Sequence, residues 1–305
     1  MEFFKTTSNI DFMGQKKIAM LFSILILIGS ILSLSTKGLN LGLDFTGGTQ
    51  VEIESLEPIN QNLIRSKLIS HKVDDISIQS FGSNKKALIR IGSGDTSSQD
   101  ELAKLLTKVL EKNTSIVRLE YIGPQVGSAL LENGILAIIV SLIITIIYIT
   151  IRFEIRFAVS AAISLIHDPV LILGIFSFYQ LEFNLIALAA LLTILGYSLN
   201  DTIVVYDRVR ENFKLTKTKS PSEIINLSIN QTLSRTLITS GLTLLVVLAL
   251  YVLGGSTLQD FALALIIGII IGTYSSIYIA GSLAVTLGLN RESLLPKKKS
   301  NALQV

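Results

Sequence analysis

Six long apolar runs constrain this chain more than any other feature of its sequence. They cover residues 18–36, 131–151, 157–179, 184–206, 233–253 and 261–287. A helix needs about 20 apolar residues to cross the hydrocarbon core of a bilayer, and each run meets that length. Because 50% of the 305 residues are hydrophobic and only 16% are charged, an ordinary soluble protein is excluded. The sequence therefore predicts a membrane protein with six spans.

Basic residues near the ends of the runs predict which side of the membrane each end faces. Lys16 and Lys17 precede the first run, which has no A-x-A-like exit and is expected to be a retained signal anchor. Short connections rich in lysine and arginine stay in the cytoplasm. This rule places there the N-terminus 1–17, a loop at about 207–232 and the tail 288–305.

Residues 37–130 have the composition of a soluble domain and are expected on the outer side of the membrane. Strand and helix periods alternate through them in the order β-α-β-β-α-β, with strands at 49–56, 76–82, 86–92 and 115–123 and helices at 59–72 and 97–113. This order is typical of the split-βαβ, ferredoxin-like fold. The predicted fold is a transporter-type six-helix bundle with one external α+β ferredoxin-like domain between the first and second spans.

An acidic residue interrupts the fourth apolar run close to its charged end. Asn200 and Asp201 lie about one and a half turns inside that end. A carboxylate at this depth costs a few kcal/mol unless it is paired, hydrated or protonated. Asp201 either reaches back to water at the interface, or faces the interior of the helix bundle as an ionisable functional group.

Arg235 enters the fifth run at a depth similar to that of Asp201, so two antiparallel helices would place opposite charges within reach. Thr236, Thr239 and Thr243 follow at three- and four-residue steps on one face of the same helix. This polar stripe would hold water or bond to backbone carbonyls. The alternative for Arg235 is a side chain that extends to the lipid headgroups.

His167 and Asp168 lie near the middle of the third run, directly before Pro169, which interrupts the backbone hydrogen bonding there. Buried hydrogen bonding and a proton relay are both open for this pair. Asp168 and Asp201 also raise an intramembrane aspartyl protease, in which two carboxylates at equal depth share one proton. Asp168 is near mid-membrane and Asp201 nearer the cytoplasmic side, which counts against the protease.

Small residues in the last run indicate close helix packing. Gly268 and Gly272 are four residues apart, and Thr273, Ser275 and Ser276 follow them. Ordinary packing between membrane helices explains this pattern better than a binding site does.

Several classes of function have no support in the sequence. Nucleotide-binding loops and a Ser-His-Asp set are missing from the segments expected in the cytoplasm, so no enzyme is expected, and neither is a metal or cofactor. Basic residues at the helix ends suit anionic membrane lipids, and without an aromatic-interleaved basic stripe no nucleic acid is expected as a partner. Any energy source other than an ion gradient would have to be supplied by a partner protein.

Five segments together resemble motifs of the SecF proteins in the SecD/SecF family of protein-export membrane proteins. They are GLDFTGGT (42–49), GPQVG (123–127), His167-Asp168, GYSLNDTIVVYDRVREN (196–212) and FALALIIGIIIGTYSSIYIA (261–280), in the order found in that family. Two of them also occur in SecD, but the single small outer domain fits SecF. The family is related to resistance-nodulation-division transporters.

The resemblance implies a proton-driven accessory of protein export in the inner, or plasma, membrane. It implies SecD as partner, beside the channel proteins SecY, SecE and SecG, with YajC as a further member and a translocating preprotein as substrate. In the family, an Asp in the fourth span and an Arg early in the fifth are functional, and these fall on Asp201 and Arg235. Asn200, His167, Asp168 and Thr239 are candidates for a relay or polar support. The alternative is a proton-coupled half-transporter for lipids or small molecules on the same scaffold.

Overall fold

A computed structural model describes residues 9–71, 73, 76–81, 83–92, 99–110, 113–216 and 218–294. These residues form two compact units. The helical unit extends to Leu39 and includes Ile138–Leu181 and the chain from Ala189 onward, and the sheet unit consists of Asn40–Ala137 and Glu182–Leu188. The start of segment 1–17, most of the tail 288–305 and the first residues of the helix expected at 97–113 lie outside the described residues.

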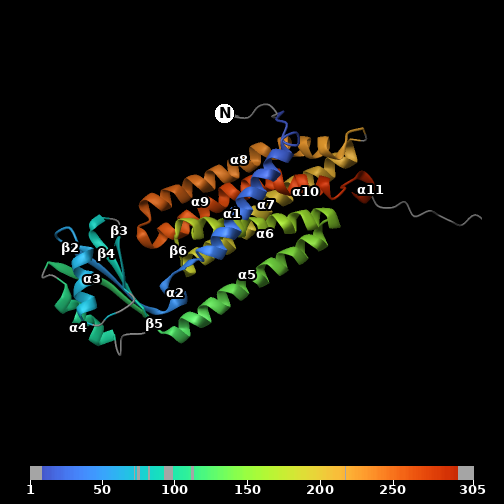
Figure 1. Cartoon of the computed structure of the whole chain (residues 1–305). Coiled ribbons are helices and arrows are strands. Elements are labelled where there is room, and N and C mark those ends of the chain that lie inside the picture. Colours follow the sequence, from blue (N-terminus) through green and yellow to red (C-terminus); the bar gives the residue numbers. More distant parts are fainter. Residues whose placement is uncertain are drawn as a thin grey trace, which may run out of the picture. The chain divides into compact units, whose positions relative to one another are not determined.

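Six helices in the described part of the chain are long and apolar enough to span a membrane, as the sequence predicts (Figure 1). They are α1 (Lys16–Thr36), α5 (Pro124–Arg152), α6 (Ile155–Tyr179), α7 (Leu185–Leu215), α8 (Pro221–Leu253) and a last span of α9 (Ser256–Tyr274), the π-helix η1 (Ser275–Ala280) and α10 (Gly281–Thr286). The short helix α11 (Arg291–Leu294) follows. The helical unit is therefore an all-α bundle.

The segment 207–232, expected as a connection between spans, is mostly helical. Helix α7 runs on to Leu215, and α8 already starts at Pro221. Ser220 and Glu223 form a capping box at the start of α8, and Pro221 occupies the first turn, where its missing N–H costs nothing. An apolar run indicates which residues can lie in the lipid, whereas the capping residues determine where the helix begins and ends. The helices therefore extend beyond the apolar runs.

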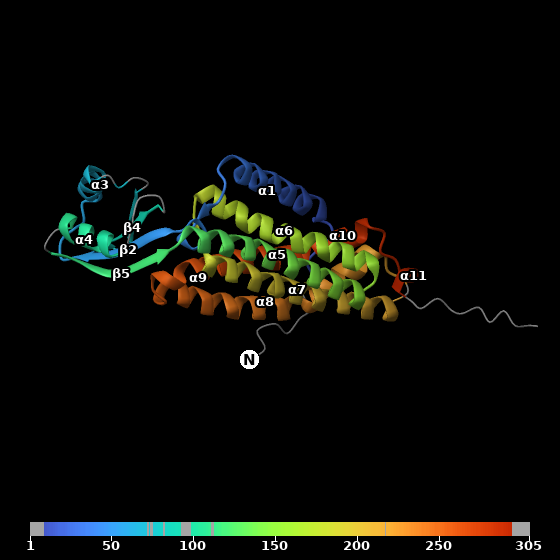
Figure 2. The same ribbon diagram turned by 90° about the horizontal axis from the view of Figure 1, so that it is seen from below.

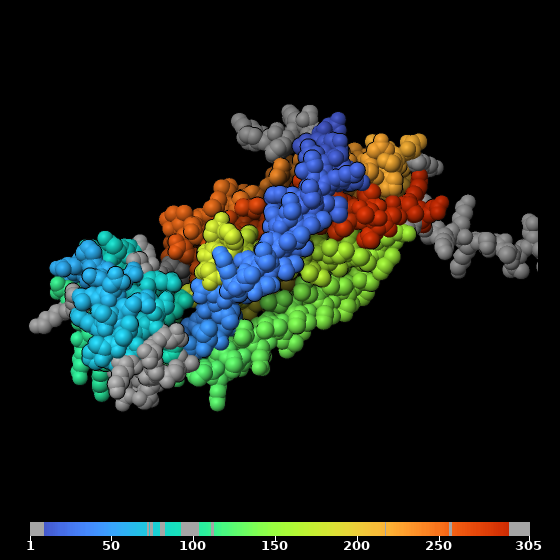
Figure 3. Space-filling view, viewed as in Figure 1, coloured from blue at the N-terminus to red at the C-terminus, as the bar shows by residue number. Residues whose placement is uncertain are grey.

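Close approach between helices in the helical unit depends on small residues. A Cβ atom added at Gly174 of α6 would lie 2.2 Å from the Cβ of Ser30 on α1, and Figures 2 and 3 show α1 lying along that side of the bundle. A Cβ at Gly268 of α9 would lie 2.1 Å from Ile194 Cδ1, and one at Gly272 would lie 3.0 Å from Ser198 Cβ. The glycine pair of the last span is thus a packing site against α7, as expected.

The sheet unit has the predicted ferredoxin-like order. Its strands are β2 (Gly48–Ser55), β3 (Ile76–Phe81), β4 (Ser83–Ile91) and β5 (Thr114–Ile122), and its helices are α3 (Gln61–Ser70) and α4 (Gln99–Val109). The strands pair antiparallel in the order β3-β4-β2-β5. Val51 on the central strand β2 faces Ile89 on one neighbour and Leu119 on the other. This register sends alternate residues of β2 to the core.

The core of the sheet unit lies between the sheet and its helices. It contains Val51, Ile53, Ile64, Leu68, Val73, Ile78, Ala87, Ile89, Ile91, Leu106 and Val109. Each fully buried aliphatic side chain of this kind contributes about 1.5–3 kcal/mol. The β3–β4 hairpin is tighter than predicted, because β4 begins at Ser83 and Phe81 pairs with Ser83. The polar residues 83–85, expected to lie between the strands, belong to the exposed start of β4.

The motifs GLDFTGGT and GPQVG meet inside the sheet unit, backbone against backbone. The first forms helix α2 (Leu43–Thr46) followed by Gly47 and Gly48, whose φ angles are 69° and 120°. A Cβ atom at Gly127, in the first turn of α5, would lie 2.8 Å from the amide nitrogen of Gly47. Only glycine permits both the backbone conformation and this approach.

The same motif also holds the beginning of helix α7. Strand β1 (Asn40–Leu41) pairs in parallel with β6 (Glu182–Phe183), and Glu182 forms an ion pair with Arg90 of β4. The backbone N–H of Leu185 donates to Asp44 Oδ2 at 2.8 Å. Since an acid at a helix N-terminus stabilises the free N–H groups there, Asp44 anchors the first turn of α7 to α2.

Candidate functional site

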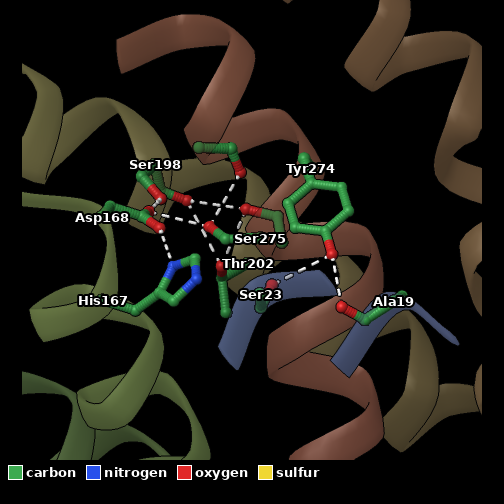
Figure 4. Close-up of polar contacts among 10 residues, drawn as sticks. Ala19, Ser23, His167, Asp168, Ser198, Thr202, Tyr274 and Ser275 are labelled. Atoms are coloured by element: carbon green, nitrogen blue, oxygen red, sulfur yellow. Dashed lines mark hydrogen bonds and ion pairs between the residues drawn. The ribbon is translucent and has the colours of Figure 1, made fainter. Parts of the chain in front are cut away.

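Asp168 lies at the centre of a buried hydrogen-bonded cluster in the helical unit (Figure 4). Its side chain is 1% exposed. Ser198 Oγ of α7 and Ser275 Oγ of η1 donate to Asp168 Oδ2 at 2.6 and 2.8 Å, and His167 Nδ1 lies 2.9 Å from Asp168 Oδ1. Three elements therefore converge on one carboxylate, which offsets part of its desolvation cost.

The π-helix η1 brings the serines of the last span to this cluster. Ser275 and Ser276 are adjacent and both buried, and their hydroxyls bond in different directions. Ser275 reaches Asp168, whereas Ser276 Oγ donates to the carbonyl of Ser198 at 3.1 Å and lies 3.0 Å from Thr202 Oγ1. π-helical turns are rare and frequently occur at functional sites. The local winding thus ties the last span to both α6 and α7.

Asp201 occupies a second polar cluster, separate from the first. Its side chain is 5% exposed, so it faces the interior of the helical unit and not an aqueous interface. Ser240 Oγ of α8 donates to Asp201 Oδ2 at 3.3 Å, and Thr273 Oγ1 of α9 donates to Ser240 Oγ at 3.0 Å. The carboxylate has fewer and longer hydrogen bonds than Asp168, which leaves it more dependent on neighbouring charge.

Arg235 supplies that charge without touching the carboxylate. It acts electrostatically on Asp201, but within the described residues the two form no direct ion pair. Arg235 is exposed on α8, and so are Asn200 on α7 and Thr239 on α8. Thr239 Oγ1 donates to the carbonyl of Arg235 at 3.0 Å, and Thr243 Oγ1 to that of Thr239 at 2.9 Å. The threonine stripe therefore bonds mainly to the backbone of its own helix.

The two carboxylates do not share a proton in the manner of an aspartyl protease. Asp168 is bonded to His167, Ser198 and Ser275, whereas Asp201 is bonded to Ser240. No hydrogen bond joins Asp168 to Asp201, both of which the structure describes. The paired-carboxylate arrangement raised by the sequence is therefore not formed.

Six hydroxyl residues of these clusters were not predicted as site residues: Ser198, Thr202, Ser240, Thr273, Ser275 and Ser276. Ser198 precedes Asp201 by three positions on α7, and Ser240 follows Thr236 by four on α8, so helical spacing alone placed both near the predicted site. Ser275 and Thr273 belong to the run of small residues whose pattern in the sequence predicts helix packing. The π-helical turn that aims Ser275 at Asp168 has no such signal in the sequence.

Comparison with known proteins connects this architecture to protein export. Residues 101–290 match the family described as "Protein export membrane protein SecD/SecF, C-terminal", and residues 32–55 match the "SecD/SecF GG Motif". The protein translocase subunit SecF of Vibrio alginolyticus is 47% identical over 296 residues, which cover 96% of this chain and 94% of that protein. The SecF subunit of Escherichia coli O157:H7 is 41% identical over 94% of this chain and 91% of its own length.

Solved structures give the same result for the fold. The crystal structure of SecDF, a translocon-associated membrane protein from Thermus, superposes with a TM-score of 0.83 at 37% identity over 92% of this chain. A second SecDF structure, in a super-membrane-facing form, gives a TM-score of 0.69 at 36% identity. This chain spans 39% of the length of each SecDF chain.

Six apolar helices with buried carboxylates, and a ferredoxin-like domain between the first and second of them, define a multi-pass membrane protein of the transporter-half class. The matched residues identify the family within that class. The chain belongs to the SecD/SecF family of protein-export membrane proteins, and the resemblance seen in its motifs is confirmed.

Proposed function

We propose that the chain is the SecF-type subunit of the Sec export machinery, which works with SecD and uses the proton gradient to promote late translocation or release of preproteins. The observation that carries this proposal is the burial of Asp201, within the motif that matches the family, beside the charge of Arg235. A buried acid with one hydroxyl partner is a group on which proton binding changes the local charge. The names of the matched relatives supply the transport role.

Proton binding at Asp201 changes the force between α7 and α8. While the carboxylate is ionised, Arg235 attracts it, and protonation removes that attraction. A membrane potential of 100 mV supplies about 2.3 kcal/mol per charge carried across, comparable to the gap between two conformations. Because α7 begins in the sheet unit, where Asp44 holds its first turn, a shift of α7 is passed along the helix to that unit.

SecD is the partner that this arrangement requires. Arg235, Asn200 and Thr239 are exposed in the single chain, and on α8 Arg235 and Thr239 lie among exposed apolar residues such as Leu237, Ile238 and Leu242. Facing lipid, an arginine within a span costs at least a few kcal/mol. Related transporters close such a site with a second, pseudo-symmetric half. SecD in turn places the assembly beside SecY, SecE and SecG, where the preprotein emerges.

Reconstitution tests the proposed function. Vesicles that contain the Sec channel and this chain together with SecD are expected to show proton-gradient stimulation of preprotein translocation. Vesicles that contain the channel and this chain alone are expected to show none, because the face around Arg235 is then open to lipid. Gradient stimulation without SecD would refute the half-assembly.

The orientation of the chain gives a second prediction. The chain has no cysteine, so single cysteines at Ser83 and Lys219 can be labelled without a background reaction. Lys219 suits this substitution, whereas its neighbour Ser220 must be kept because its hydroxyl caps α8. A membrane-impermeant thiol reagent is expected to label position 83 from outside intact cells and position 219 only after the membrane is opened. The reverse pattern would overturn the assignment of both termini to the cytoplasm.

A lipid or small-molecule half-transporter would need an apolar pocket in the sheet unit. A cavity there, lined in part by Leu43, Thr46, Ser77 and Arg90, has a volume of about 220 Å³. Typical ligand pockets are larger, at about 300–1,000 Å³, and mostly apolar. The small size of this cavity and the arginine in its wall favour export over lipid transport.

A further inference from the structure

Two polar atoms on helix α6 are buried without a hydrogen-bond partner among the described residues. They are His167 Nε2 and Ser164 Oγ, on side chains that are 7% and 3% exposed. Residues three apart on a helix lie on the same face, one turn from each other. Pro169 lacks the N–H that would otherwise bond to the carbonyl of Leu165 in this turn. Hydrogen-bonding groups without a partner are therefore concentrated in this turn of α6, inside the helical unit.

The hydrogen bonds around Asp168 indicate which ring nitrogen carries the proton. Asp168 faces two hydroxyl donors and His167 Nδ1, a set that suits an ionised carboxylate, which can only accept. His167 Nδ1 is then the donor, an assignment made from the network. With Nδ1–H bonded to Asp168, Nε2 of the neutral ring is an acceptor with a free lone pair. Nε2 itself has no hydrogen-bond partner among the described residues.

We propose that His167 and Asp168 form a proton-binding site, with His167 Nε2 as the atom that takes the proton. The proton arrives from water and converts the neutral imidazole to an imidazolium, while Nδ1–H keeps its bond to Asp168. The pair then changes from a net charge of −1 to 0, which removes an uncompensated charge from a low-dielectric site. The proton site itself does not depend on the proposed function. Only the role of this proton in export rests on it.

Other ionisable groups on the helices around His167 contact residues other than His167 and Asp168. On α7, Tyr197 bonds to Thr243, Asp201 to Ser240, and Tyr206 to Ser160 and Ala280. On the last span, Tyr274 bonds to Ser23 and Ala19, and the ring of Tyr278 contacts that of Tyr274 at a tilt of 36°. Helix α1 has no ionisable side chain between Lys17 and Lys37. Asp168 is thus the carboxylate that governs the charge of His167.

Histidine-specific ¹⁵N NMR of the full chain in lipid nanodiscs tests the proposal, because the chain has only two histidines. The other, His71, is exposed at the end of α3 and serves as the internal reference for a solvated ring. The variant His71→Gln assigns the two sets of signals. Nitrogen shifts distinguish a protonated from an unprotonated ring nitrogen, so they report the tautomer and the charge directly.

At high pH, His167 is expected to show a protonated Nδ1 and an unprotonated Nε2. When the pH is lowered, Nε2 is expected to gain a proton. In Asp168→Asn, which removes the counter-ion, the doubly protonated ring is expected to be less populated than in the wild type at the same low pH. A His167 ring that stays singly protonated when the pH is lowered, or that carries its single proton on Nε2, would overturn the proposal.

The wild-type spectrum decides this question without any variant of the α6 cluster, so misfolding of Asp168→Asn cannot mask the answer. The measurement also requires neither SecD nor a proton gradient. A failed reconstitution therefore counts against the proposed function alone. A His167 ring whose protonation state does not change counts against this site alone.

Discussion

Replacing Asp201 with asparagine is expected to abolish the proton-gradient-dependent part of preprotein export. Asparagine keeps the shape of the side chain and can still bond to Ser240, but it cannot ionise, so the attraction of Arg235 is permanently lost. Arg235→Ala is expected to have the same effect, because it leaves a buried carboxylate without its charge partner. Translocation into vesicles that contain SecD and the Sec channel, measured with and without an imposed gradient, gives the result.

Asp207→Asn is the matched control for this experiment. Asp207 lies on the same helix, but its side chain is 43% exposed and pairs with Arg152 at 2.9 Å. An exposed pair contributes about 0–1 kcal/mol, so the control should export normally. ATP-driven threading by the cytoplasmic motor, and co-purification with SecD, should survive in all three variants. Full gradient stimulation by the assembled Asp201→Asn protein would leave Asp201 as a packing residue.

Gly48→Ala is expected to have the largest effect on the stability of the sheet unit. Gly48 begins the central strand β2 with a φ of 120°, and an added Cβ would lie 2.5 Å from the carbonyl oxygen of Ile91. Backbone strain of this kind costs about 1–3 kcal/mol, and the clash with a backbone atom adds to it. Amide hydrogen exchange in β2 and β4 of the full chain is expected to become at least about tenfold faster.

Gly38→Ala separates the effect of backbone strain from the effect of a clash with a neighbouring backbone atom. Gly38 also has a positive φ, of 69°, but an added Cβ there meets no atom within 4 Å. It should cost only about 1–2 kcal/mol of local strain, and exchange in β2 and β4 should remain at the wild-type rate. Equal effects of the two substitutions on β2 and β4 would show that the approach to Ile91 is unimportant.

Much of the fold could be predicted because its two kinds of pattern, long apolar runs and residue periodicity, are clear in the sequence. Spans appear as apolar runs of about 20 residues, and the sheet unit alternates between periods of two and 3.6. The helix ends could not be predicted from hydropathy, since the last turns of α7 and the first of α8 are polar and are stabilised by caps and by mutual hydrogen bonds. Asn212 Nδ2, for example, donates to Ser228 Oγ at 2.8 Å.

The candidate site was predictable in its charged residues and not in their partners. A charge within an apolar run is conspicuous, so Asp168, Asp201 and Arg235 could be found by inspection. Their hydroxyl partners are common residues of membrane helices, and their roles depend on how three helices are rotated against each other. The depth argument brought Arg235 to Asp201 but could not show that Arg235 faces outward while Asp201 faces inward.

The anchoring of α7 in the sheet unit also had no signal in the sequence. GLDFTGGT follows the first span in the sequence, yet its Asp44 bonds to the first turn of the fourth. Parallel pairing of two-residue strands that are about 140 positions apart in the chain, such as β1 and β6, is too short to leave a periodic pattern. Such contacts emerge only from the folded chain.

The π-helical turn of the last span determines how that helix responds to the loss of one residue. In an α-helix each residue advances the direction of the side chains by about 100°. Deleting one residue from Ser275–Ala280 would let the helix return to α winding, and because a π turn contains one residue more than the α turn it replaces, Gly281–Thr286 would keep about their present directions. The buried face of that segment, formed by Gly281, Ser282 and Ala284, would be kept after such a deletion, whereas deleting one residue of α9 with the π turn intact would rotate it by about 100° relative to the start of the span. In this helix the count of residues carries structural information that the identity of any single one does not.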